Sequence, residues 1–483
     1  MSLKILLVNP PIYDFAAYDF WLKPYGLLSV AGYLRGKADF ALFDYLDRLH
    51  PFAADRQNLQ SDQWGRGTFY QQQIQSPPCL EQIPRHFRRF GLPRQIFAAF
   101  LADAAPPDYV LIQTMMTYWY QGVREVIEDI RTTFPKAKIV LGGNYVTLCP
   151  AHARTLGADL CIQGTNLAPL WDYLALEPDL AQPALWEAYD KLNVGILRLT
   201  DGCPFKCTYC SVPKVYGDFT PRPIDRCLAE LQLLIKLGAK DIAFYDDALL
   251  FKPEKALTPF LTRIISQYDI QHPTSQTTSP KRERRGIYTM RDGWQPQAKL
   301  GDGHNAIRDT RYAIRPPNFH SPNALNARFI TKQIADLMVR AGFKTFYLGF
   351  ESASAKWQRR TGSKVFCEEL AQAVEHLKAA GADPTGITAY QILGHPQTDS
   401  QQLEESMHFV NSLGITGMLA DFSPIPGTPD GDYCAKYVDM AEPLNHSKTA
   451  FPITLLGFKE SNRLKDVQRA LNRNLRSPHR PIV

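Results

Sequence analysis

The chain has 483 residues, of which 45% are hydrophobic and 21% are charged, and its formal net charge is +6. This composition can bury large cores and excludes an intrinsically disordered protein. The small, dispersed positive charge does not indicate nucleic-acid binding, and no segment approaches the ~18 consecutive apolar residues of a membrane-spanning helix. The sequence opens directly into a strand pattern without a signal peptide, so we expect a cytoplasmic protein of two or three domains.

The first part of the chain alternates short apolar runs with amphipathic segments. Apolar runs of this length predict buried strands, and helical spacing between them predicts helices. This alternation is typical of an open, doubly wound parallel α/β sheet, which we expect over residues 1–185. The expected strands are residues 3–9, 40–45, 108–114, 137–143 and 159–164, and the expected helices are residues 24–35, 93–104 and 120–134.

The ends of these strands supply the first candidate site residues, because ligands of open parallel sheets bind outside the carboxyl ends of the strands. Gly142 and Gly143 close one predicted strand. Glycines there either let the backbone approach a ligand closely or only turn the chain, and spacing alone does not separate the two. The other candidates at strand ends are Asn9, Pro10, Thr114, Asn144 and Gly164.

Three cysteines, Cys203, Cys207 and Cys210, stand within eight residues in a C-x3-C-x2-C pattern. Three thiolates can bind three irons of a [4Fe–4S] cube and leave the fourth iron open to another ligand. A zinc site would need a second cysteine pair or a histidine pair nearby, and the neighbouring sequence has neither. The chain has nine scattered cysteines, an odd number that argues against a disulfide framework. The spacing therefore favours a cluster site.

Strand–helix units continue after the cysteines. Repeated units of this length predict a parallel barrel or partial barrel over residues 190–430, with its chemistry at the carboxyl ends of the strands. Among the residues there, Asp246 and Asp247 would equally suit a helix N-cap, and Glu351 a solvent-exposed cap. The candidate site residues at these ends are Asp246, Asp247, Glu351, Gln391 and Gly394.

Residues 269–318 interrupt the barrel pattern. The segment is rich in Pro, Gly, Gln, Arg and Thr and has little apolar periodicity, and a loop of this length is uncommon in a compact domain. We expect an insertion that forms a surface loop, a lid or a substrate clamp. Residues 431–483 form a C-terminal extension with a basic amphipathic helix over residues 461–476, for which Ser461 is the expected N-cap.

The cysteine segment, residues 200–211, resembles the signature of the radical S-adenosylmethionine (SAM) enzymes. The resemblance implies a partial barrel of six strand–helix units, with Cys203, Cys207 and Cys210 as the ligands of a [4Fe–4S] cluster. SAM would chelate the open iron through its amino and carboxylate groups. An electron from a donor such as flavodoxin or ferredoxin, passed through the cluster, would cleave SAM reductively to a 5′-deoxyadenosyl radical.

The same resemblance assigns roles to side chains around the barrel. Tyr209 is the aromatic residue before the third cysteine and implies a contact with SAM. Glu351 occupies the family position where an acidic residue meets the ribose or methionine part of SAM. The further residues implied to contact SAM, or in the case of the aspartates the substrate, are Asp246, Asp247, Gln391 and Gly394.

The N-terminal part resembles the cobalamin-binding domain that precedes the barrel in one large class of these enzymes. The shared features are an Asn-Pro-Pro strand end at residues 9–11, a Pro-x-Gly-Leu helix start at residues 24–27 and the Gly-Gly strand end at residues 142–143. The Asp-x-His-x-x-Gly motif that would ligate cobalt is absent, as in class members that hold cobalamin without a protein ligand, and residues 163–166 lack the acidic residues usual there. The residues implied to contact cobalamin are Asn9, Pro10, Thr114, Gly142, Gly143, Asn144 and Gly164.

These patterns together predict a radical SAM enzyme that transfers a methyl group from cobalamin to an unactivated carbon or phosphorus. Two alternatives stay open. The first is a radical SAM enzyme without cobalamin, which would rearrange, cyclise or oxidise its substrate. The second is a non-catalytic, cluster-bearing binding or sensor protein. The sequence does not identify the substrate, for which we expect a small molecule or another partner, and it indicates neither a membrane nor a nucleic acid.

Overall fold

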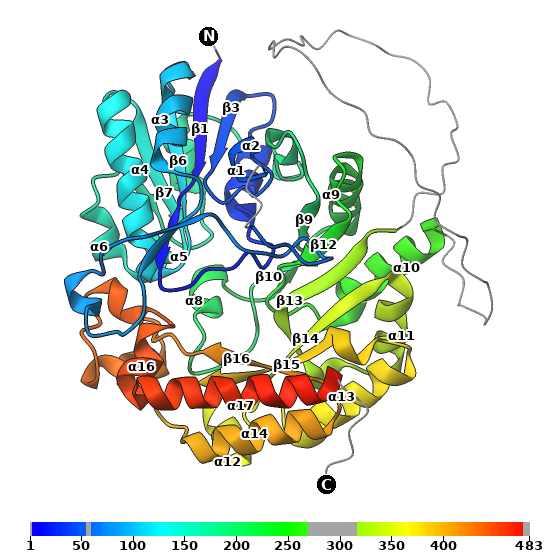
Figure 1. Ribbon diagram of the computed structural model, residues 1–483. Coiled ribbons are helices and arrows are strands. Elements are labelled where there is room, and N and C mark those ends of the chain that lie inside the picture. Colours follow the sequence, from blue (N-terminus) through cyan, green and yellow to red (C-terminus); the bar gives the residue numbers. More distant parts are fainter. Residues whose placement is uncertain (1, 55–58, 269–315, 477–483) are drawn as a thin grey trace, which may run out of the picture.

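The structure is a computed structural model that describes residues 2–54, 59–268 and 316–476. Two parallel sheets form its framework, one near the N-terminus and one that curves into a partial barrel (Figure 1). The predicted α/β class, with a doubly wound sheet followed by a partial barrel of six strands, is confirmed. Within the described ranges, no helix is both long and apolar enough to cross a membrane.

The N-terminal sheet has five parallel strands. In spatial order they are β3 (Ala38–Asp44), β1 (Leu3–Asn9), β6 (Tyr109–Thr114), β7 (Lys138–Gly143) and β8 (Leu160–Ile162). Successive side chains of a strand point to opposite faces, so Leu6 and Val8 pack on one face and Ile5 and Leu7 on the other. The first face is covered by α3 (Arg94–Asp103) and α4 (Tyr120–Thr133), and the second by α1 (Tyr25–Tyr33) and α7 (Ala168–Leu174).

A second, small sheet, whose strands were not predicted, and an arm formed by residues 15–24 lie between β1 and β6 in the chain. The antiparallel strands are β2 (Ile12–Asp14), β4 (Gln71–Gln73) and β5 (Arg88–Phe90). The arm carries Trp21, which is fully buried and stacks on His320 of the barrel with ring centroids 4.6 Å apart. The arm thus fixes the N-terminal part against the barrel interior.

The partial barrel has six parallel strands whose spatial order follows the chain. They are β9 (Val194–Leu197), β12 (Asp241–Phe244), β13 (Asn318–Asn326), β14 (Phe343–Glu351), β15 (Ile387–Leu393) and β16 (Thr416–Asp421). Its apolar core includes buried side chains of α9 (Ile224–Lys236), α10 (Leu257–Tyr268), α11 (Lys332–Ala341) and α13 (Cys367–Ala379). The predicted insertion, residues 269–318, lies outside the described residues up to residue 315, and its last residue, Asn318, begins β13.

The C-terminal extension contacts both parts of the molecule. Its α16 (Ala450–Leu456) contributes Ala450 and Ile453 to the core beneath α3 and α4. The following α17 (Phe458–Arg476) runs beside α14 (Ser400–Ser412) and β16 (Figure 1). The expectation that Ser461 caps this helix was wrong, because the helix begins at Phe458 and the buried Ser461 hydroxyl donates to the Pro452 carbonyl.

Candidate active site

The three cysteines lie on one loop between β10 (Thr200–Asp201) and α8 (Val212–Tyr216). All three are half-buried and free of disulfides. The loop can bend here because Gly202 has a φ of +69°, and a side chain at that position would meet the Asp218 carbonyl at 2.3 Å. The local sequence therefore folds the loop so that Cys203, Cys207 and Cys210 share one region of the molecule.

Burial and a nearby cation act in opposite directions on the thiols of the loop. Burial raises the pKa of the Cys203 thiol to about 11 and that of the Cys210 thiol to about 12, whereas the nearby Lys364 ammonium acts in the opposite direction on both. Ligating sulfur must be deprotonated, and bound iron offsets the cost of burying thiolates. The three thiols therefore fit an iron–sulfur cluster.

Within the described residues, no group of three or more His, Cys, Asp or Glu side chains is arranged to hold one metal ion. The ligands of an iron–sulfur cluster bind separate irons, so a cluster does not need such a group.

A series of unpaired polar atoms lies at the carboxyl ends of five neighbouring barrel strands. Each atom is buried and has no hydrogen-bond partner among the described residues, although buried polar groups are normally paired. From β12 to β16 these atoms are Asp246 Oδ2, Asn326 Nδ2, Glu351 Oε2, Gln391 Oε1 and Asp421 Oδ1. Three of the predicted SAM residues belong to this set. Gln391 and Asp421 lie on the helix-covered face of the sheet, because Leu393 and Leu419 on the same face pack against α14 and α17, and Asp421 pairs with Lys465 of α17. The unpaired atoms of Asp246 and Glu351 stay available to a polar ligand such as SAM.

Glu351 and Lys364 form a buried ion pair beside the cysteine loop. The Lys364 ammonium donates to Glu351 Oε1 at 2.8 Å. Burial acts to lower the pKa of Lys364, but the Glu351 carboxylate together with Cys207 and Cys210 outweighs it, and the pKa is raised. Glu351 also has a φ of +65°, a strained conformation for a non-glycine residue that often marks functional sites. The predicted alternative of a solvent-exposed cap is wrong, because Glu351 is buried.

The two adjacent aspartates have different surroundings. Asp246 Oδ1 accepts hydrogen bonds from the Leu199 amide at 2.9 Å, the Thr200 amide at 2.6 Å and the Thr200 hydroxyl at 2.7 Å. Asp247 pairs with Arg198 at 3.1 Å. Burial raises the pKa of each carboxyl to about 6. One oxygen of Asp246 therefore anchors the chain that enters the cysteine loop, and its other oxygen is left for a ligand.

The remaining predicted SAM residues lie around the same region. The Tyr209 ring stacks on Trp357 with centroids 5.9 Å apart. Gln391 is fully buried and uses its amide nitrogen on the Ala389 carbonyl at 3.2 Å. Gly394 has a φ of +80°, and a side chain there would meet Pro452 at 2.6 Å. The glycine is therefore required by packing against α16, and its contact with SAM stays a prediction.

A cavity of about 530 Å³ lies outside the carboxyl ends of the N-terminal strands. Among the predicted cobalamin residues, those that line it are Thr114, Gly142, Gly143, Asn144 and Gly164. The two glycines differ. Gly143 turns the chain, with a φ of +116° and no room for a side chain beside the Thr114 carbonyl, whereas a Cβ on Gly142 would meet no atom within 4 Å. Gly142 therefore leaves space for a ligand.

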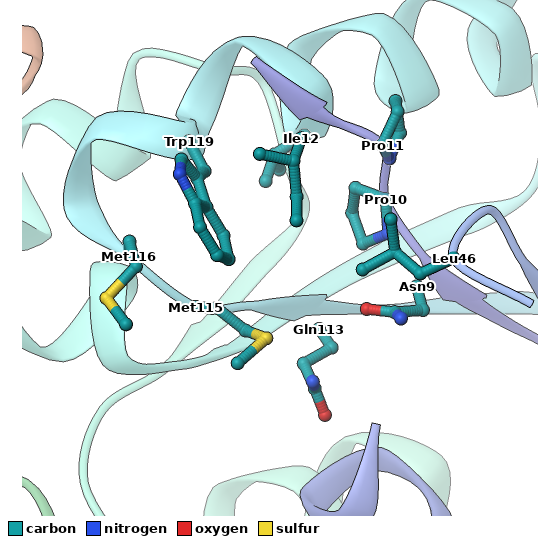
Figure 2. Close-up of a pocket in the computed structure, with 10 residues that line it drawn as sticks. Asn9, Pro10, Pro11, Ile12, Leu46, Gln113, Met115, Met116 and Trp119 are labelled. Atoms are coloured by element: carbon teal, nitrogen blue, oxygen red, sulfur yellow. The ribbon is translucent and has the colours of Figure 1, made fainter. Parts of the chain in front are cut away.

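Asn9 and Pro10 face a neighbouring space. They line a small cavity of about 20 Å³ together with Met115 and Gln113 (Figure 2). The Asn9 side chain donates to Asp44 at 2.7 Å and is buried. Met115 and Gln113 also line the large cavity, so the two spaces adjoin. Direct contact of Asn9 and Pro10 with cobalamin stays a prediction.

The barrel side of the large cavity is made of residues that the sequence patterns did not identify. Tyr216 donates to Asn144 at 3.1 Å, and the Arg198 guanidinium lies 4.8 Å above the Tyr216 ring. Arg222 pairs with Asp201 at 2.7 Å. Because Arg198 also pairs with the barrel carboxylate Asp247, these side chains connect the cavity to the strand ends. No short motif marks them; only their nearness to the cysteine loop could have suggested them.

Comparisons with known proteins agree with this architecture. No family model matches the chain. An uncharacterised methyltransferase of Pyrococcus horikoshii is 22% identical over 247 residues, which are 50% of this chain and 42% of that protein, so the chain spans less than half the length of this curated relative. Among solved structures, the radical SAM methyltransferase TsrM of Kitasatospora setae, with cobalamin and a [4Fe–4S] cluster bound, has a TM-score of 0.63 at 14% identity.

The structural match extends over almost the whole chain. The TsrM alignment covers 97% of this chain and 91% of that one. The cobalamin-dependent SAM radical enzyme OxsB aligns with a TM-score of 0.50 at 13% identity, covering 98% of this chain and 62% of that one. At these identities the likeness concerns the fold. The chain therefore has the two-part fold of the cobalamin-dependent radical SAM enzymes.

Proposed function

We propose that this protein is a radical SAM enzyme of the cobalamin-dependent kind, which transfers a methyl group to an unactivated centre of a small molecule. Cys203, Cys207 and Cys210 hold a [4Fe–4S] cluster in this proposal. The polar strand ends of the barrel bind SAM, and the large cavity binds cobalamin. When bound, these groups supply the reductive cleavage of SAM and the methyl transfer.

The observation that carries the proposal is that the cysteine loop, the polar strand ends of the barrel and the large cavity lie next to one another. The segment of Gly362 and Lys364 connects the cysteine loop to a strand end. Gly362 packs closely on the loop, since a Cβ on it would stand 3.2 Å from Cys207 Cα. Two residues later, Lys364 forms an ion pair with Glu351 at the end of β14. Arg198 joins those strand ends, through Asp247, to the large cavity. A substrate between the cavity and the barrel could therefore reach both cofactors.

The protein's own side chains orient the cofactors and exclude water. The unpaired atoms of Asp246 and Glu351 can fix the polar parts of SAM. Trp21 and Tyr245 close one side of the barrel interior, where the Tyr245 hydroxyl donates to the Trp21 carbonyl. A dry, pre-organised site of this kind protects a reactive radical from side reactions.

The redox partner and compartment follow from the same chemistry. A one-electron donor such as flavodoxin or ferredoxin would reduce the cluster, which requires a protein surface near the cysteine loop. We place the enzyme in the cytoplasm, because reducing conditions keep its free cysteines, Cys203, Cys207 and Cys210 among them, available as ligands.

The test is anaerobic purification in the presence of cobalamin, followed by iron, sulfide and cobalt analysis and an assay of reductive SAM cleavage. We expect about four irons and one cobalt per chain, with 5′-deoxyadenosine or a methylated product formed from SAM. A triple Cys→Ala variant at positions 203, 207 and 210 should lose the iron and keep the cobalt. Iron without cobalt would refute the methyl-transfer part and favour radical chemistry that does not use cobalamin.

A further inference from the structure

The cysteine loop is tied to the C-terminal part of the barrel by a hydrogen-bonded chain that the function above does not explain. The Thr208 hydroxyl, between Cys207 and Cys210, donates to Asp430 Oδ2 at 2.5 Å. The same oxygen is 3.0 Å from His395 Nε2. We call the side chains of Thr208, Asp430 and His395 the Asp430 latch.

The latch is a defined arrangement. His395 and Asp430 are buried. His395 Nδ1 faces two donors, the Trp357 indole N–H at 3.4 Å and the Gln397 amide at 3.2 Å, so Nδ1 accepts and the proton lies on Nε2, directed at Asp430. The carboxylate therefore accepts from both His395 and Thr208, and these bonds, working against the effect of burial, lower the pKa of Asp430.

Asp430 holds Thr208 at two points. Its backbone amide donates to the Thr208 carbonyl at 3.0 Å, in addition to the side-chain bond. Two bonds to one residue fix both its position and its orientation, and Thr208 directly follows Cys207. A second contact reaches the loop through rings, because Trp357 packs edge-on to His395 and stacks on Tyr209. The loop between two cysteines is thus positioned from α15 (Pro429–Tyr433) and from the end of β15.

We propose that Asp430, oriented by His395, is a positioning residue that holds the cysteine loop in its cluster-binding conformation and places a negative charge beside the cluster. The inference rests on the proposed function, because it takes Cys203, Cys207 and Cys210 as cluster ligands. Outer hydrogen bonds that orient metal ligands commonly change metal affinity by about 10- to 100-fold. Charge and hydrogen bonding near a cluster also set its reduction potential.

Three variants separate the geometry of the latch from its charge. Thr208→Val removes the hydroxyl at nearly constant shape, and Thr208→Ser keeps it as the matched control. Asp430→Asn keeps an oxygen that can accept from Thr208 and His395 but removes the negative charge. Each reconstituted protein is tested for the rate of iron release to a chelator without oxygen, and for the midpoint potential of the cluster by a redox titration followed by electron paramagnetic resonance.

We expect Thr208→Val to release iron about tenfold faster than the wild type, since a hydrogen bond to a charged group is lost. Thr208→Ser should stay within about twofold of the wild type, because serine keeps the hydroxyl that donates to Asp430. Asp430→Asn should shift the potential to a more positive value, because removal of a negative charge favours the reduced cluster. A positioning role predicts both effects, whereas a packing role predicts neither the rescue by serine nor the change of potential.

The outcomes distinguish this inference from the proposed function. Wild-type protein that binds no iron after reconstitution would refute the cluster and the latch together. Wild-type protein with about four irons, and a Thr208→Val variant with the wild-type release rate, would refute the latch alone. Iron release that is accelerated equally in Thr208→Val and Thr208→Ser would also show that the bond is only structural. So would a metal-free Thr208→Val chain whose unfolding temperature falls as far as that of the reconstituted variant.

Discussion

Asp246 offers a way to separate structural support from ligand binding within one carboxylate. Oδ1 accepts three hydrogen bonds from Leu199 and Thr200, and Oδ2 is buried without a partner among the described residues. Asp246→Ala removes both oxygens. Asp246→Asn keeps an acceptor for the three donors and removes the charge. Only Asp246→Ala therefore removes the acceptor of the three hydrogen bonds, whereas both variants remove the negative charge.

The magnitudes follow from these contacts. In Asp246→Ala, two buried backbone amides lose their acceptor at a cost of about 1–3 kcal/mol each, so the chain should lose roughly 2–6 kcal/mol of stability. In Asp246→Asn the cost is small, because burial raises the pKa of Asp246 to about 6 and thus already disfavours its charged form. At about 1.4 kcal/mol per pKa unit, a carboxylate with this pKa costs the folded chain about 3 kcal/mol at neutral pH with its hydrogen bonds already counted, and the neutral asparagine does not carry this cost.

The two variants make different predictions for SAM. If Oδ2 accepts from the SAM ammonium, Asp246→Asn should weaken SAM binding by about tenfold or more while the chain stays stable, since a hydrogen bond between charged groups contributes about 1.5–3 kcal/mol. Equilibrium dialysis with labelled SAM on the reconstituted protein measures the affinity, and denaturant unfolding of the metal-free protein measures stability. Wild-type SAM affinity in a stable Asp246→Asn variant would refute the binding role, and a stable Asp246→Ala variant would refute the structural one.

Three further predictions concern other parts of the molecule. Gly142→Leu should abolish cobalt binding but retain iron, because its side chain enters the large cavity where a Cβ meets no atom within 4 Å; unchanged cobalt would place the cofactor elsewhere. Burial lowers the pKa of His446 to about 4. As the pH falls from 6.5 to 4, the unfolded chain is therefore protonated before the folded one, and the metal-free protein should lose about 3 kcal/mol of its free energy of unfolding. A His446→Gln variant with the same pH profile of unfolding as the wild type would contradict this. Asn472→Ala should cost about 1–3 kcal/mol in unfolding measurements, because Asn472 bonds both backbone groups of Gly417; the exposed Arg473→Ala is the control, and an equal loss there would show a general effect on the helix.

The sequence by itself determined the two sheets and the chemical character of the centre. Short apolar runs separated by amphipathic helices are sufficient to predict parallel strands, because each such strand is buried on both faces. The spacing of Cys203, Cys207 and Cys210 is local information, so the site proposed for a cluster could be located before any fold was known. The strand ends that carry Asp246 and Glu351 could also be located, because ligands bind at one edge of such sheets.

Only the tertiary structure decided which side chains meet. The pairing of Glu351 with Lys364 and of Thr208 with Asp430 joins residues that are 13 and 222 positions apart in the chain. The periodicity of a sequence states which face of an element is buried, but not what packs against it. For the same reason, the barrel wall of the large cavity around Arg198, and the burial of Trp21 against His320, emerge only when the two parts of the molecule lie together.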